Sequence, residues 1–228
     1  MVPIDTAPGN PPDPRLIQAL RAEESSTRLK AALAAGTHPH PDLLEALVAR
    51  CGVEPDFFVR DMLTWALTRL PAALTVPRLR AELGREPAQA RSQALHTLSK
   101  IRDGSAYPAI TRSLLRDPDD EVARAAWRAA VTLVPDGERE RLAVELASQL
   151  GRGGRTVRLS LSRALVDLGE VIEPVLRGRL DAGDPTVSAH ARATELLLHD
   201  PEVGFDEAVA EATRIVALGP GRGGAQAC

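Results

Sequence analysis

Residues of the types that do chemistry occur in three short segments of the sequence. In the first, THPHP, His38 and His40 precede Asp42, and two imidazoles with a nearby carboxylate are groups that ligate zinc. No further cluster of Cys, Asp or Glu with ligand spacing accompanies them, and the prolines are typical of a loop between helices. We therefore predict no metal site in this segment and no cofactor for the protein.

The other two segments could supply a nucleophile or bind a phosphate. Cys51 stands just before Gly52, at the expected end of a helix, and nothing in the sequence places a histidine beside its thiol. The segment 151–155, GRGGR, resembles a phosphate-binding loop but lacks the Lys-Ser/Thr pair of such loops. We interpret it as a hinge whose arginines, with Arg158 and Arg163, form a local basic patch. The sequence thus predicts no catalytic residue, and a protein that is not an enzyme.

The elements that must position any site are predicted to be helices. Only 3% of the 228 residues are aromatic, and alanine, leucine and valine supply most of the 44% that are hydrophobic. This composition favours closely packed helices over strands. The stretch 119–135, DDEVARAAWRAAVTLVP, has an acidic start, then a Val-x-Arg triplet, and then small or apolar residues at every third or fourth position. Because the pattern recurs along the chain, it indicates a helical repeat.

One arginine marks this repeat. It stands near the start of the second helix of each helix pair and returns at intervals of about 31 to 34 residues. We call these residues the marker arginines: Arg28, Arg60, Arg91, Arg124 and Arg158. Residues three and seven positions after a marker are small or apolar, as Trp127 and Val131 are, and we predict that they face the core together with Val122. Phe58 is placed in the same apolar set.

Residues one, five and eight positions after each marker lie roughly opposite the core face, and we predict that they form an outward ridge. Its members are mostly small and weakly polar, which suits a groove for a helix or an extended peptide. Within and beside this ridge, four residues are predicted to bind a partner: Trp65, His96, Arg128 and Arg163. The alternative is that the small residues only let neighbouring second helices approach closely.

The repeat length, the Asp-x-x-Val-Arg opening and a small residue about six positions later resemble HEAT repeats, in their bacterial PBS-lyase-like branch. The small residues are Ala34, Ala66, Ala130 and Ala164. The resemblance covers about residues 14 to 200. It implies an all-α protein, a right-handed α-solenoid of about six antiparallel helix pairs.

The resemblance also implies a ladder of acidic residues and arginines that joins successive repeats. Asp56 is four residues before Arg60, as Asp120 is before Arg124 and Glu24 before Arg28, and such i,i+4 pairs stabilise a helix. Pro87, Gly154 and Ser188 depart from the pattern. The predicted structural ladder comprises Arg28, Asp56, Arg60, Arg91, Asp120, Arg124 and Arg158.

Three functions are compatible with such an array. We favour a non-enzymatic scaffold or adaptor that binds a protein or peptide on the ridge of its second helices. A HEAT-like DNA-binding protein or DNA glycosylase is an alternative, but the net charge of −3 and the scarcity of outward aromatic residues disfavour nucleic acid. The other alternative is an accessory lyase-type protein that acts on a bound chromophore or cofactor, although the sequence identifies no tetrapyrrole site.

The two ends of the chain are predicted to lie outside the repeats. We expect a disordered segment at 1–13, a HEAT-like domain with a C-terminal capping helix at 14–218, and a flexible Gly-rich tail at 219–228. The sequence contains no secretory signal and no apolar run long enough to span a membrane, and its two cysteines do not suggest disulfides. We therefore expect a cytoplasmic protein without a membrane partner, and the resemblance to the bacterial branch of HEAT repeats implies a bacterial one.

Overall fold

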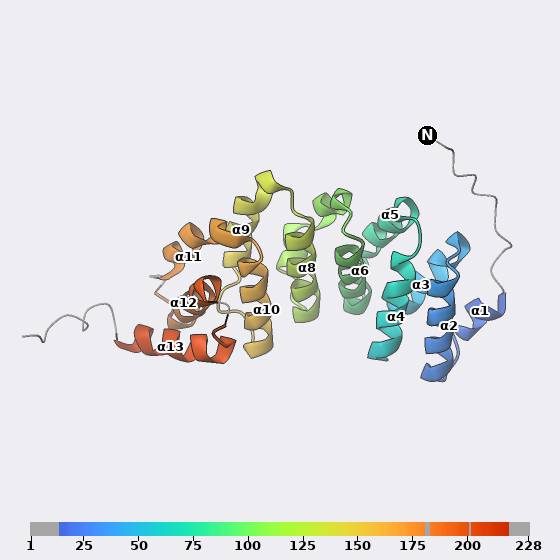
Figure 1. Cartoon of the computed structure of the whole chain (residues 1–228), viewed down its shortest axis with the longest axis horizontal. Helices are drawn as coiled ribbons and strands as arrows, with labels where there is room; N and C mark the ends of the chain where they lie inside the picture. The colour runs from blue at the N-terminus through green and yellow to red at the C-terminus, as the bar shows by residue number, and fades with distance from the viewer. Residues whose placement is uncertain (1–13, 181–182, 201, 219–228) are drawn as a thin grey trace, which may run out of the picture. The chain divides into compact units, whose positions relative to one another are not determined.

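The computed structural model describes residues 14–180, 183–200 and 202–218 (Figure 1). Throughout these ranges the regular structure is helical and no strand occurs, which confirms the predicted all-α class. The chain divides into two compact units, Met1–Ile110 and Thr111–Cys228. The segment and tail predicted at 1–13 and 219–228 lie outside the described residues, and the right-handed solenoid stays a prediction.

The first unit is built from helix pairs. In chain order its helices are α1 (Pro14–Ala19), α2 (Ser25–Thr37), α3 (Leu44–Cys51), α4 (Phe57–Thr68), α5 (Ala72–Glu82) and α6 (Ala88–Ile101). Short 3₁₀ turns precede α3 (Pro41–Leu43) and follow α6 (Gly104–Ala109). The two helices of each pair pack on each other, and α4 also packs against both α2 and α6 (Figure 1). The second helices of successive pairs therefore form one layer of this unit.

The second unit repeats the same arrangement. Its helices are α7 (Arg112–Leu115), α8 (Asp120–Leu133), α9 (Arg139–Ala147), α10 (Arg155–Val166), α11 (Glu173–Leu180), α12 (Pro185–His199) and α13 (Phe205–Leu218). Short 3₁₀ turns precede α9 (Asp136–Glu138) and α11 (Gly169–Ile172). Here α10 packs between α8 and α12, and α13 packs along α12, where Ala193, Ala208 and Ala212 are buried. Each unit thus contains stacked helix pairs, as the repeat in the sequence predicts.

Aspartates begin three of the second helices. The carboxylate of Asp119 accepts hydrogen bonds from the backbone N–H groups of Glu121 and Val122, at 2.9 and 3.1 Å, and so caps α8. Asp56 and Asp184 cap α4 and α12 in the same way. These amides have no partner within the helix, and a negative charge is favourable at this end of it.

The helix α5 contains a proline in its interior. It starts at Ala72 and continues through Pro77. The turn before this proline buries Thr75 and Val76, which are 0% and 3% exposed. Burial of these side chains offsets the backbone hydrogen bond that an interior proline removes.

The predicted core face is largely buried in the second unit. Val122 and Trp127 are both 0% exposed, whereas Val131 is only partly buried. The indole Nε1 of Trp127 donates to the carbonyl of Leu115 at 2.8 Å, so its one polar group is satisfied inside the core. No helix among the described residues has both the length and the apolar character needed to cross a membrane.

Candidate functional site

The marker arginines of the first unit bind the loop that precedes their own helix. Nη1 of each one donates to two backbone carbonyls, those of the residues six and five positions earlier. The three sets are Arg28 with Ala22 and Glu23, Arg60 with Glu54 and Pro55, and Arg91 with Arg85 and Glu86. Because a guanidinium group carries several donors, one side chain can hold both carbonyls. The marker therefore closes the turn between the two helices of a pair.

This contact replaces the acid–arginine pairs that we predicted. Asp56 accepts backbone N–H bonds as the cap of α4, while Arg60 binds the two carbonyls of the loop. In α8, Arg124 pairs with Glu121 at 2.5 Å between Nη1 and Oε1, and not with Asp120. For Asp56 the physical reason is that a carboxylate at the helix start is already held by backbone amides that have no partner within the helix.

Asp120 contributes to a different contact, which joins two helix pairs. Arg152, in the loop before α10, lies 2.9 Å from a carboxylate oxygen of Asp120 and donates to the carbonyl of Asp117. Its guanidinium carbon is also 5.8 Å from the centre of the Trp127 ring. The segment that we interpreted as a hinge is therefore anchored to the start of α8.

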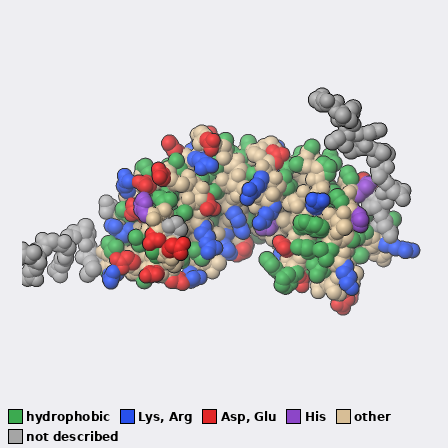
Figure 2. All heavy atoms as spheres, in the orientation of Figure 1, with side chains coloured by type: hydrophobic (Ala, Val, Ile, Leu, Met, Phe, Trp, Pro, Cys, Tyr) green, Lys and Arg blue, Asp and Glu red, His purple; other side chains and the backbone are tan. Residues whose placement is uncertain are grey.

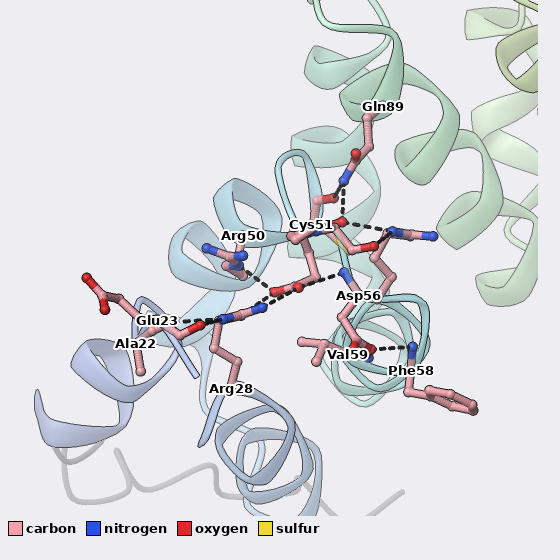
Figure 3. A network of polar contacts seen from close by, with 12 residues as sticks. Ala22, Glu23, Arg28, Arg50, Cys51, Asp56, Phe58, Val59 and Gln89 are labelled. Carbon is pink, nitrogen blue, oxygen red and sulfur yellow. Dashed lines mark hydrogen bonds and ion pairs between the residues drawn. The ribbon is translucent and has the colours of Figure 1, made fainter. Parts of the chain in front are cut away.

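A buried carboxylate connects the helix pairs of the first unit (Figure 3). Glu54 is 0% exposed and accepts hydrogen bonds from Arg28, at 2.7 and 2.8 Å, from Arg50, at 2.7 Å, and from the N–H of Asp56. Its own carbonyl accepts from Gln89 of α6 at 2.8 Å. Burial opposes ionisation of the carboxyl group, but these donors outweigh it and lower its pKa to about 2. We interpret this cluster as a contact that holds the helix pairs together and not as a ligand site.

Only some residues of the predicted outward ridge are exposed to solvent. Trp65 is 37% exposed, Arg128 and Arg163 are exposed, and His96 is half-buried. Several residues predicted on the ridge are buried instead, among them Ser92, Ser99, Ala125 and Ala129. Small side chains let neighbouring elements close over them, which is the alternative considered from the sequence.

The exposed arginines line a hollow of the second unit, between α8 and α10, with a volume of about 270 Å³. Six polar side chains face it: Arg124, Arg128, Thr156, Ser160, Arg163 and Asp167. Figure 2 shows Lys and Arg side chains gathered over these two helices on the face in view. We call this hollow the arginine pocket. Two residues predicted separately from the sequence, Arg128 and Arg163, thus meet at one place.

The arginine pocket keeps an excess of positive charge. Arg128 and Arg163 form no ion pair within the described parts of the chain, and Arg124 shares its charge with Glu121 only. The pKa of Arg128 is lowered, first by partial removal from water and then by the charge of Arg124. The Nε of Arg124 has no hydrogen-bond partner among the described residues. Positively charged guanidinium groups that lack a carboxylate partner therefore line the arginine pocket together.

The first unit exposes aromatic rings on one helix. Phe57, Phe58 and Trp65 of α4 are 66%, 70% and 37% exposed. We call them the α4 aromatic surface, and Figure 2 shows hydrophobic side chains gathered around α4. The prediction that Phe58 lies in the core is wrong, because Val59 turns inward in its place and is 1% exposed.

Two contacts hold the rings of this surface. The rings of Phe57 and Phe58 meet edge to face at 5.7 Å, and the guanidinium of Arg60 lies 5.9 Å from the Phe57 ring. Trp65 lies against Gly36 of α2, where a Cβ atom would come within 2.1 Å of the indole. The indole is therefore fixed on one side and open to solvent on the other.

A buried polar cluster of the second unit escaped the sequence analysis. Nδ1 of His190 accepts a hydrogen bond from the N–H of Gly151 at 3.0 Å, so the ring proton is on Nε2. Nε2 is 3.1 Å from the carbonyl of Arg158 and 3.0 Å from Oγ of Ser162. Because Nε2 already carries a proton, His190 cannot take one from Ser162, and the two do not form an activated nucleophile. Burial lowers the pKa of His190 to about 4.

The other candidate residues have structural contacts. His40 accepts a hydrogen bond from the N–H of Asp42 through Nδ1, at 3.2 Å, and so begins the turn before α3. Cys51 is buried, and burial raises the pKa of its thiol to about 12, so the thiol stays protonated. Across the described ranges no three His, Cys, Asp or Glu side chains are grouped to hold a metal ion.

The chain is similar to solved structures of other proteins. No family model and no curated protein matches the chain. The chain is similar to the structure of the complex of CpcE and CpcF of phycocyanin lyase from Nostoc sp. PCC7120, at 18% identity. The alignment covers 93% of this chain and 97% of that chain, with a TM-score of 0.47.

This comparison corrects one prediction. From the lack of catalytic motifs we predicted a protein that is not an enzyme, whereas the solved structure aligned with nearly the whole chain belongs to a lyase. The prediction is contradicted and is withdrawn.

Proposed function

We propose that this chain is a HEAT-like helical-repeat protein that binds another protein through the α4 aromatic surface. The proposal is carried by the exposure of Phe57, Phe58 and Trp65 on a single helix. Trp127 and Phe205, by contrast, are buried. Large exposed aromatic side chains that are grouped together are typical of sites that a partner covers, and tryptophan is enriched among residues that dominate binding.

The fold does not require these rings. Leu63 and Leu67, on the opposite side of α4, are both 0% exposed and supply the packing of that helix. Phe58 and Trp65 lie two turns apart on one face of α4, so a partner helix or strand could contact both. His96 has on α6 the repeat position that Trp65 has on α4, and we propose it as a further contact.

The proposal is tested by purifying the chain with its partner from the native host. We expect a protein to copurify in near-stoichiometric amount with the wild type and with Leu74→Ala, and to be lost with Phe58→Ala. Leu74 is the matched control, because it is 46% exposed on α5 of the same unit. Equal recovery with all three chains would refute the α4 aromatic surface. Visible absorbance from a chromophore in the same sample would instead favour the lyase-type alternative.

A further inference from the structure

The arginine pocket has the properties of an anion site that the fold itself does not use. Other arginines of the second unit pair with carboxylates, as Arg155 does with Asp206 and Arg116 with Glu145. Arg128 and Arg163 form no ion pair with a carboxylate of the described residues, yet they line the same hollow from adjacent helices. Like charges held together are unfavourable unless an anion lies between them.

The residues that line the arginine pocket favour a carboxylate as the bound anion. Guanidinium groups bind carboxylates through two parallel N–H bonds, and the hydroxyl groups of Thr156 and Ser160 can add further donors. Leu159 lines the same hollow and offers an apolar contact for the methylene groups of an acidic side chain. A volume of about 270 Å³ accommodates side chains and not a duplex.

Two features disfavour a nucleic acid. No aromatic residue lines the pocket, so a base would have no ring on which to stack. Asp167 lines the same hollow, where its carboxylate repels a continuous row of phosphates more than a single carboxylate. The protein as a whole carries a net charge of −3, which adds to this repulsion.

We propose that the arginine pocket binds a glutamate- or aspartate-containing segment of a partner protein, with Arg128 and Arg163 as the carboxylate-binding residues. Arg124 supplies additional positive charge and Asp167 limits the number of acidic groups that bind. The proposal concerns the second unit alone and does not depend on the α4 aromatic surface.

The test measures binding of a fluorescent glutamate-rich peptide to the full chain at low salt, by anisotropy. We expect Arg128→Gln and Arg163→Gln each to weaken binding about tenfold, since each variant loses a charge-assisted hydrogen bond to a peptide carboxylate. Arg141→Gln is the matched control, because it removes the same charge from an 86% exposed side chain of α9. A peptide with glutamine in place of glutamate should not bind.

A gain of affinity separates recognition from loss of structure. Asp167→Asn removes the competing carboxylate, so it should tighten peptide binding several-fold, an outcome that misfolding cannot produce. Phe58→Ala should leave peptide binding unchanged. The peptide assay therefore tests the arginine pocket independently of the proposal for the α4 aromatic surface. Equal affinity of the Arg128→Gln, Arg163→Gln and Arg141→Gln variants would overturn the proposal. Tighter binding of a single-stranded oligonucleotide than of the acidic peptide would overturn it as well.

Discussion

Arg28 of α2 and Glu54, just before α4, form a two-pronged hydrogen-bonded pair that is closed to water. Nε and Nη2 of Arg28 lie 2.7 and 2.8 Å from the two carboxylate oxygens, and the side chains are 6% and 0% exposed. The residues are 26 positions apart in the chain. The pair therefore ties the first helix pair of the unit to the second.

Removal of the Glu54 charge should strongly destabilise the first unit. Glu54→Gln leaves the Arg28 guanidinium buried without a counter-charge, and breaking a buried pair in this way typically costs about 3–5 kcal/mol. Glu45→Gln is the control, because Glu45 also pairs with an arginine but is 71% exposed, so its loss should cost less than about 1 kcal/mol. Urea unfolding, followed by Trp65 emission in a Trp127→Phe background, measures both. Equal midpoints for the two variants would contradict the assignment.

The same carboxylate should make the first unit sensitive to strong acid. The pKa of Glu54 is about 2 in the folded chain and 4.5 in its ordinary state. Between these values the unfolded chain binds the proton more readily, so stability is complete above pH 4.5 and falls as the pH is lowered toward 2. The loss amounts to about 3 kcal/mol. Unfolding free energies measured in this window should change with pH in the wild type and much less in Glu54→Gln.

Protonation of His190 should make the stability of the second unit depend on pH, over a higher pH range than protonation of Glu54 does for the first unit. Burial lowers its pKa to about 4 from an ordinary 6.5. The unfolded chain therefore binds the proton first as the pH falls, and stability of the second unit is lost between pH 6.5 and 4. His190→Gln should flatten this part of the profile, read by Trp127 emission in a Trp65→Phe background. A slope that survives the substitution would assign the effect to another group.

Gly36→Ala should displace the indole of Trp65. The added methyl group would lie 2.1 Å from Cζ3 of the ring, and the ring has room to move only toward solvent. We expect red-shifted Trp65 emission and a loss of about 1 kcal/mol, the usual scale for overpacking. Gly84→Ala serves as the control, because a Cβ atom at Gly84 has no neighbour within 4 Å. Identical spectra for the two variants would disprove the close packing.

Arg102→Gly should stabilise the first unit. Arg102 follows the last residue of α6 with a φ angle of 59°, in the left-handed region that favours glycine. Removing its Cβ relieves this strain and should raise the free energy of unfolding by about 1 kcal/mol. Arg102→Ala keeps the Cβ atom and should bring no such gain. Thermal unfolding of the two variants tests this prediction, and equal unfolding midpoints would contradict it.

The sequence predicted the helices and most of the core because both follow from local periodicity. The spacing of Val122 and Trp127 predicts their burial, and the capping aspartates mark where helices begin. Periodicity does not decide how closely the neighbouring elements approach. Ala125 and Ala129 are therefore buried although the helical wheel places them outward.

The partners of the charged residues could not be predicted in the same way. Glu54 lies outside any helix, and no spacing rule connects it with Arg28. The His190 cluster draws on α10, α12 and the loop between α9 and α10, so it exists only once those elements have packed. The sequence did indicate Arg128 and Arg163 individually, but their shared hollow depends on how α8 packs against α10.

The contact between each marker arginine of the first unit and two backbone carbonyls bears on how this architecture tolerates change. Every residue type carries a carbonyl, so a loop residue whose side chain makes no other contact can be exchanged while the arginine keeps its anchor; Glu54, whose carboxylate binds Arg28, is the exception. Substitutions at such loop positions therefore leave the position of the second helix unchanged. A scan of all substitutions at Glu23 and Glu86 should accordingly find most of them neutral, beside an intolerant Arg28.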